Sequence, residues 1–185
     1  MADIIEIRDP YAGGHTRRVH DYCLMIADQL ELNKMESDQL RLAAILHDIG
    51  KVGISDQVLL KPGRLTPKEF KAIEVHSVCG SNKLKRIKML QGIIPGIRNH
   101  HERFDGRGYP DRLMERKIPL MARIICIADA FDAMTTDRPY RKGLQFDEAI
   151  SELEKCAGTQ FDPQLVRAFV DAWRKKQSPS GPPGF

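Results

Sequence analysis

Apolar residues in this chain recur at helical spacing, and no segment shows the strict apolar–polar alternation of a half-buried strand. In the clearest helix, at about residues 15–30, Val19, Cys23 and Ile26 fall on one face. Further helices are predicted at about residues 37–49, from 66, at 93–102, from 119 through 128, at 147–157 and at 163–175. The pattern predicts an all-α fold, a single-domain helical bundle of about seven helices.

Capping residues mark where several of these helices begin and end. Thr66, Pro67 and Glu69 form a capping box with proline at the first helical position. Gly50 is expected to cap the end of the second helix. Residues 103–117 are rich in glycine and lack periodicity, which predicts a loop.

Length and composition indicate one ordinary globular domain. The chain has 185 residues, 42% hydrophobic and 29% charged, and its net charge of +4 gives no sign of a nucleic-acid partner. We expect the domain to cover residues 1–176 and the Pro/Gly/Ser-rich residues 177–185 to form a disordered tail. No apolar run is long enough to cross a membrane and the start is unlike a signal peptide, so a cytoplasmic location is expected. The oligomeric state is left open.

A histidine–aspartate pair, His47–Asp48, ends the second predicted helix among apolar neighbours. Burying an aspartate there costs free energy unless a cation or hydrogen bonds compensate. Alone, the pair is weak evidence, because a hydrogen-bonded His–Asp couple can also be purely structural. Its interpretation therefore depends on the other ligand-type side chains.

Such side chains recur at the ends or inward faces of the other predicted helices. Asp129 interrupts an otherwise apolar helix, and His76 falls on the inward face of its helix. His100 and His101 end the fourth helix, and His15 begins the first. Because bundles commonly build metal sites from inward side chains on facing helices, the pattern favours a metal centre over unrelated histidines.

The number and kind of these side chains define the expected centre. The predicted metal ligands are His15, His47, Asp48, His76, His100, His101 and Asp129. They exceed what one ion with open positions uses, so we expect two divalent transition-metal ions, with one oxygen of Asp48 on each. Imidazole and carboxylate without thiolate suit Fe or Mn, and also Zn, Co or Ni, and argue against Ca and Mg. His20 is left out because it lies off the helical face of His15.

The segments that carry these residues resemble, in their order, the HD-GYP domain family, a branch of the HD phosphohydrolase superfamily. The resemblance covers about residues 9–173 and is specific, since it includes the Gly-Tyr-Pro triplet that names the family. It rests on HTRRV at 15–19, HDIGK at 47–51, LKPG at 60–63, His76, HHERFDGRGYP at 100–110, IADAFDAM at 127–134 and RPYR at 138–141.

The resemblance implies that the chain hydrolyses the cyclic dinucleotide cyclic di-GMP at a di- or trinuclear metal centre. The product would be linear pGpG, with further conversion to GMP left open. The resemblance implies the same seven metal ligands and a phosphate contact for Lys51. It also implies partners such as receiver, sensor or diguanylate cyclase (GGDEF) domains. The chain shows none of these domains, so we expect a stand-alone enzyme or an excised part of a longer one.

One position departs from the family pattern. Trinuclear members place a glutamate four residues before the first motif histidine, and here that position is Tyr11. A phenol with a reference pKa of about 10 is a poor ligand at neutral pH. We therefore expect a dinuclear centre.

The expected mechanism assigns catalytic roles to Asp48 and Lys51. A hydroxide bridging the two ions would attack phosphorus, while Lys51, four residues after His47, contacts a phosphate oxygen. The alternative for Lys51 is a simple favourable position at a helix C-terminus.

Four further residues are expected to bind substrate. Gly108 and Tyr109 would form a lip of the pocket, with Tyr109 facing a guanine or a phosphate. Arg138 and Arg141 would clamp the second phosphate. The alternative for Gly108 and Tyr109 is a plain surface turn. The alternative for Arg138 and Arg141 is that they are solvated surface charges.

Two rival functions stay open at this point. A related enzyme could act on a nucleotide or on a mixed guanine–adenine cyclic dinucleotide. A catalytically weak cyclic-dinucleotide sensor or partner-docking module is the rival from another functional class.

Overall fold

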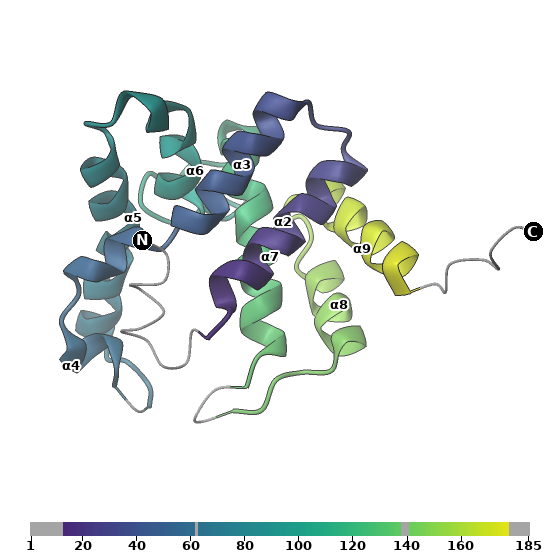
Figure 1. The fold of residues 1–185 in the computed structure, drawn as a ribbon. Coiled ribbons are helices and arrows are strands. Elements are labelled where there is room, and N and C mark those ends of the chain that lie inside the picture. Colours follow the sequence, from purple (N-terminus) through teal and green to yellow (C-terminus); the bar gives the residue numbers. More distant parts are fainter. Residues whose placement is uncertain (1–12, 62, 138–140, 178–185) are drawn as a thin grey trace, which may run out of the picture.

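The computed structural model describes residues 13–61, 63–137 and 141–177, and every regular element in this part of the chain is a helix (Figure 1). The α-helices are α2 (His15–Gln29), α3 (Lys34–Leu46), α4 (Asp56–Leu59), α5 (Pro67–Leu84), α6 (Ile94–Asn99), α7 (Leu120–Thr135), α8 (Phe146–Lys155) and α9 (Pro163–Gln177). Three short 3-10 helices join them: η1 (Ile49–Gly53), η2 (Lys88–Ile93) and η3 (Glu115–Lys117). The prediction of an all-α bundle is confirmed, with the short α4 as the helix that the periodicity did not indicate.

Helices α2 and α7 form the middle of the molecule (Figure 1). Helix α2 packs against α3, α7 and α9, while α7 also contacts α6 and α8. On the left of Figure 1, α5 packs against α6 and η1. Segments far apart in the sequence therefore meet where α2, α3, α5, α6 and α7 approach one another.

The hydrophobic core lies along α7 and extends to the α9 side. Ile124, Ile125 and Ile127 of α7 are fully buried, which accounts for the strongly apolar sequence of this helix. Beyond them, the Phe131 ring makes edge-on contacts with Phe169 and Trp173, at centroid distances of 4.8 and 5.1 Å. This packing anchors α7 against α9.

The ends of α3 differ from the prediction. The helix begins at Lys34, because Asn33 and Glu36 form a capping box, and ends at Leu46. Gly50 is therefore not its cap, and that prediction is wrong. Gly50 lies in η1, where a Cβ atom would stand 1.8 Å from the backbone oxygen of His76, so only glycine allows η1 to lie this close to α5.

Several predictions concern residues outside the described part of the chain. Tyr11, Arg138 and most of the expected tail, residues 178–185, lie there. Helix α9 continues through Gln177, and the boundaries proposed for the domain stay a prediction. None of the helices in the described ranges is both long and apolar enough to cross a membrane.

Candidate metal centre

The predicted ligands form two groups that share Asp48. We call His15, His47 and Asp48 the outer group, and Asp48, His76, His100 and His101 the inner group. Within each group, one ligand atom per residue lies within 4.8 Å of the others. The structure thus brings together side chains from α2, α5 and the ends of α3 and α6.

The carboxylate of Asp48 lies between the two groups, with one oxygen toward each. Its Oδ1 atom is 3.3 Å from Nε2 of His76, in the inner group. Its Oδ2 atom is 3.5 Å from Nε2 of His47 and 3.8 Å from Nε2 of His15, in the outer group. This arrangement suits a carboxylate that bridges two cations.

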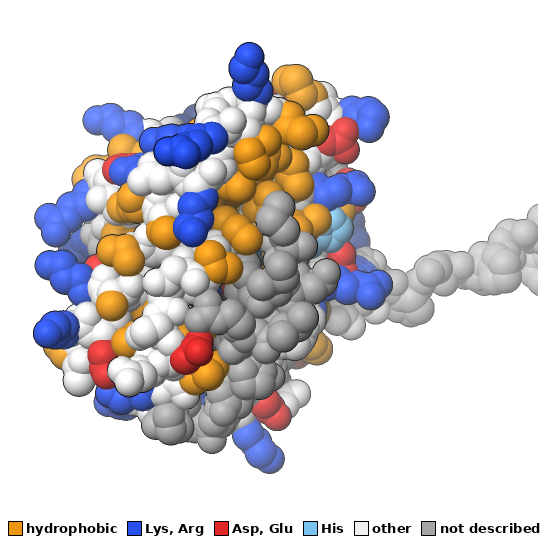
Figure 2. All heavy atoms as spheres, turned by 60° about the vertical axis from the view of Figure 1, so that its left-hand side comes forward, with side chains coloured by type: hydrophobic (Ala, Val, Ile, Leu, Met, Phe, Trp, Pro, Cys, Tyr) orange, Lys and Arg blue, Asp and Glu red, His pale blue; other side chains and the backbone are white. Residues whose placement is uncertain are grey.

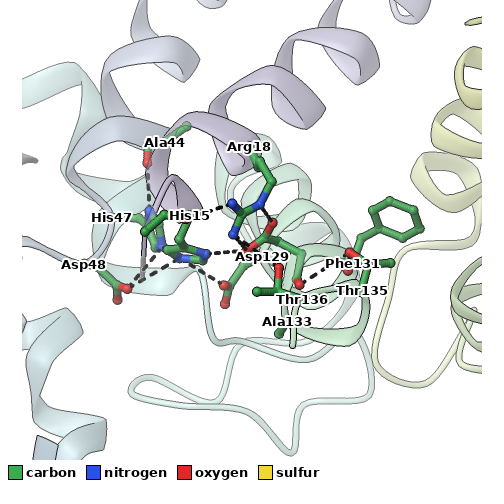
Figure 3. Close-up of polar contacts among 12 residues, drawn as sticks. His15, Arg18, Ala44, His47, Asp48, Asp129, Phe131, Ala133, Thr135 and Thr136 are labelled. Atoms are coloured by element: carbon green, nitrogen blue, oxygen red, sulfur yellow. Dashed lines mark hydrogen bonds and ion pairs between the residues drawn. The ribbon is translucent and has the colours of Figure 1, made fainter. Parts of the chain in front are cut away.

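The seventh predicted ligand, Asp129, approaches the outer group from α7. Its Oδ1 atom is 3.6 Å from Nε2 of His15, and Figure 3 shows both side chains pointing toward Asp48. His20, the remaining histidine, hydrogen-bonds Asp21 and belongs to neither group.

Main-chain carbonyl groups fix the orientation of three imidazoles. In His47, His76 and His100, Nδ1 lies 2.7 Å from the carbonyl oxygen of the residue three positions earlier. Since a carbonyl oxygen only accepts, each Nδ1 donates and each Nε2 presents a lone pair to the centre. Nε2 of His76 is 3.3 Å from that of His100, and Nε2 of His15 is 3.4 Å from that of His47. Converging lone pairs at this spacing fit cation ligands, as in other metal-binding histidines with a second hydrogen bond.

The charge states of the inner group suit a metal. Burial, together with the neighbouring histidines, lowers the pKa of His100 and of His101 well below its usual value, so both imidazoles are neutral near pH 7. Burial opposes ionisation of Asp48, but the ammonium group of Lys51 is the largest opposing influence, and the pKa of this carboxyl is held well below its usual value. Neutral imidazoles around an ionised carboxylate are the donor set that divalent transition metals take.

Asp132 and Arg18 support the outer group, and the sequence interpretation gave neither a role. Nδ1 of His15 donates to Asp132 Oδ2 at 2.7 Å, and Arg18 Nε donates to Asp132 Oδ1 at 2.5 Å (Figure 3). Burial opposes ionisation of Asp132, but these two hydrogen bonds keep its pKa lowered. One signal was present: Asp132 follows Asp129 by three residues in an apolar helix and so shares its face.

The glycine-rich loop folds back onto the inner group. The buried carboxylate of Glu102 accepts hydrogen bonds from the backbone N–H groups of Asp111 and Leu113, at 2.7 and 3.1 Å. A Cβ atom on Gly108 would lie 2.3 Å from a backbone nitrogen, so glycine is required where the loop touches its own chain. The Tyr109 ring consequently stacks on His101, with a centroid distance of 4.9 Å. Glu102, which the sequence interpretation also left without a role, holds this loop in place.

The remaining predicted substrate contacts are placed differently from one another. Lys51 lies at the centre, with Nζ 2.5 Å from Asp48 Oδ2. Arg141 is exposed and donates to the carbonyl oxygen of Ala133 at the end of α7, at 2.6 Å. Arg138 lies outside the described residues. Binding of substrate by these side chains stays a prediction.

Comparisons with known proteins agree with this architecture. A cyclic di-GMP phosphodiesterase of Thermotoga maritima is 41% identical over 167 residues, 89% of this chain and 45% of the relative. The 3'3'-cGAMP-specific phosphodiesterase 3 of Vibrio cholerae is 38% identical over 91% of this chain and 37% of its own length. The chain thus spans less than half the length of these curated relatives.

Among solved structures, the protein Bd1817 of Bdellovibrio bacteriovorus, an HDG"Y"P protein, shares the fold. The TM-score is 0.69 at 23% identity, over 86% of this chain and 51% of that protein. The HD domain family matches residues 1–165, which is most of this chain. The chain therefore belongs to the HD domain family, in agreement with the resemblance of its motifs to the HD-GYP branch.

Proposed function

We propose that this chain is a metal-dependent phosphodiesterase that hydrolyses cyclic di-GMP to linear pGpG. Two relatives with about 40% identity are named as phosphodiesterases of cyclic dinucleotides, one for cyclic di-GMP and one for 3'3'-cGAMP. This pair supports the substrate class, and the choice of cyclic di-GMP rests on the motif pattern. Because the relatives are more than twice as long, the activity of the whole protein is part of the proposal.

The observation that carries the proposal is the position of Asp48 between the two ligand groups. One oxygen faces His76 and the other faces His47 and His15, as expected for a carboxylate shared by two divalent ions. Bound divalent ions would supply Lewis acidity toward a phosphate and lower the pKa of water.

The chain's own residues would bind and orient both the ions and the substrate. The outer group would hold one ion together with Asp129, and the inner group would hold the other. Lys51 lies beside Asp48, where its ammonium group can meet a phosphate oxygen as a point charge. The buried imidazoles exclude water from the inner side of the centre, which strengthens electrostatic interactions there.

A substrate panel tests the proposal. Protein loaded with Mn or Fe is incubated with cyclic di-GMP and with 3'3'-cGAMP, and the products are separated by chromatography. We expect conversion of cyclic di-GMP to pGpG, with slower cleavage of the mixed dinucleotide. Faster cleavage of 3'3'-cGAMP would change the proposed substrate but not the class of enzyme, a cyclic-dinucleotide phosphodiesterase. Tight binding of both without turnover would instead support the sensor or docking module.

A further inference from the structure

An open cleft of about 560 Å³ lies between α5 and the glycine-rich loop, next to the inner group. Its volume falls within the range of small-molecule sites. The residues of its wall used below are Lys71, Glu74, Val75, Val78, Tyr109 and Arg112. The side of the molecule that carries α5 faces the viewer in Figure 2, where hydrophobic side chains gather between Lys and Arg side chains.

One face of α5 forms a wall of this cleft. Residues 71, 74, 75 and 78 follow the helical spacing of a single stripe, with Val75 and Val78 as its apolar part. The half-buried Glu74 lies in this stripe, and its carboxylate makes no hydrogen bond or ion pair with any described residue. A carboxylate in such surroundings is ready to accept hydrogen bonds from a ligand.

Tyr109 joins the cleft to the metal centre. Its ring stacks on His101 of the inner group and also lines the cleft. Tyr109 therefore lies in contact with both the inner group and the cleft. A ligand in the cleft would therefore adjoin any phosphate held at the centre.

The wall of the cleft matches a guanine nucleotide. An aromatic ring and two valines provide a surface on which a base can stack. The Watson–Crick edge of guanine presents two adjacent donors, N1–H and the N2 amino group, which the two oxygens of a carboxylate such as Glu74 can accept together. Adenine presents one donor beside an acceptor, so one carboxylate oxygen would face a lone pair. The cationic side chains of Lys71 and Arg112 at the rim suit the phosphates.

We propose that this cleft binds one base of the cyclic dinucleotide and that Glu74 selects guanine there. The inference rests on the proposed substrate class and adds a residue that determines specificity. A mixed dinucleotide can place its guanine in the cleft. Glu74 would therefore discriminate mainly against cyclic di-AMP, which has no guanine.

The test is Glu74→Gln, since a glutamine amide matches the donor–acceptor edge of adenine but has a single acceptor oxygen and cannot accept from N1–H and N2 of guanine together. We expect kcat/KM for cyclic di-GMP to fall about 10- to 100-fold, as for loss of one bidentate base contact. The kcat/KM for cyclic di-AMP should rise at the same time. The ratio of the two kcat/KM values, cyclic di-AMP over cyclic di-GMP, should therefore increase by more than the loss for cyclic di-GMP alone explains. Metal content should equal that of wild type. Glu154→Gln, an exposed acid-to-amide change on α8, is the matched control and should leave both rates unchanged.

Equilibrium binding of both dinucleotides, measured alongside turnover, separates this inference from the proposed function. If wild type hydrolyses cyclic di-GMP but Glu74→Gln alters both dinucleotides equally, the cleft assignment is wrong and the function stands. If wild type binds cyclic di-GMP without cleaving it, the function is wrong, and a selective loss of guanine binding in Glu74→Gln still supports the cleft. Absence of binding to either dinucleotide would overturn both.

Discussion

The inner and outer ligand groups share Asp48 but are supported in different ways. In the inner group, His76 and His100 are completely or almost completely buried and hydrogen-bond main-chain carbonyls of their own helical turns. In the outer group, His15 is the first residue of α2, its side chain is 15% exposed, and the side chain of Asp132 orients it. The inner position thus depends on helix backbones, whereas the outer one depends on side-chain contacts except at His47, which hydrogen-bonds the main-chain carbonyl of Ala44. We therefore expect the outer ion to bind more weakly.

Removing the shared ligand should have the largest effect. Asp48→Ala takes one ligand from each group, so both ions and the activity should be lost. Because a catalytic ion supplies several kcal/mol of transition-state stabilisation, we expect kcat/KM to fall at least about 10³-fold. Elemental analysis and assay on cyclic di-GMP measure the two losses. An Asp48→Ala protein that cleaves at the wild-type rate would rule out the shared-carboxylate centre.

Removing His15 should separate the two groups. His15→Ala takes a ligand from the outer group alone, so metal content should fall from two ions to about one, and kcat/KM about 100-fold. The matched control is His20→Ala, five residues along the same helix and outside both groups, which should keep both ions. Equal metal loss in the two variants would show that the outer group is not a ligand set.

Weakening the support of His15 should have a smaller effect. Asp132→Asn keeps the shape of the side chain but removes the charge that faces His15 and Arg18. We expect the affinity for the more weakly bound ion to fall about 10- to 100-fold, as for other outer-shell partners of metal ligands. In a calorimetric titration with the metal, two binding steps are expected. Only the weaker step should shift in Asp132→Asn. A shift of the tighter step instead would reverse our ranking of the groups.

The contact between η1 and α5 sets the inner side of the centre. Gly50→Ala would push a methyl group into the backbone of His76, and we expect a loss of about 1–3 kcal/mol in the free energy of unfolding. Gly53→Ala in the same 3-10 helix meets only Cys79 Sγ at 3.4 Å, so its change should stay within about 0.5 kcal/mol. Denaturant unfolding of both variants measures the difference. Equal stability of the two would mean that η1 and α5 are not packed this closely.

Helical periodicity was enough to predict the all-α fold, because apolar faces such as that of α2 repeat over several turns. The positions of the ligand-type side chains at helix ends also led to the two groups that the structure brings together. Glu102 and Asp132 were not identified, because their roles depend on hydrogen bonds to distant positions. The partners of Glu102 are 9 and 11 positions away in the sequence, and the partner of Asp132 is 117 positions away. The role of Gly50 was assigned wrongly because it depends on a tertiary contact with α5. Local sequence shows the periodicity of a helix but not the tertiary contacts that the helix makes with other segments.

The ion content of the wild-type chain tests the central claim most directly. Protein purified without chelators and supplied with Mn or Fe should contain two ions per chain by elemental analysis, taken up in two steps of different affinity. One ion per chain, or none, would contradict a centre built on two ligand groups that share Asp48.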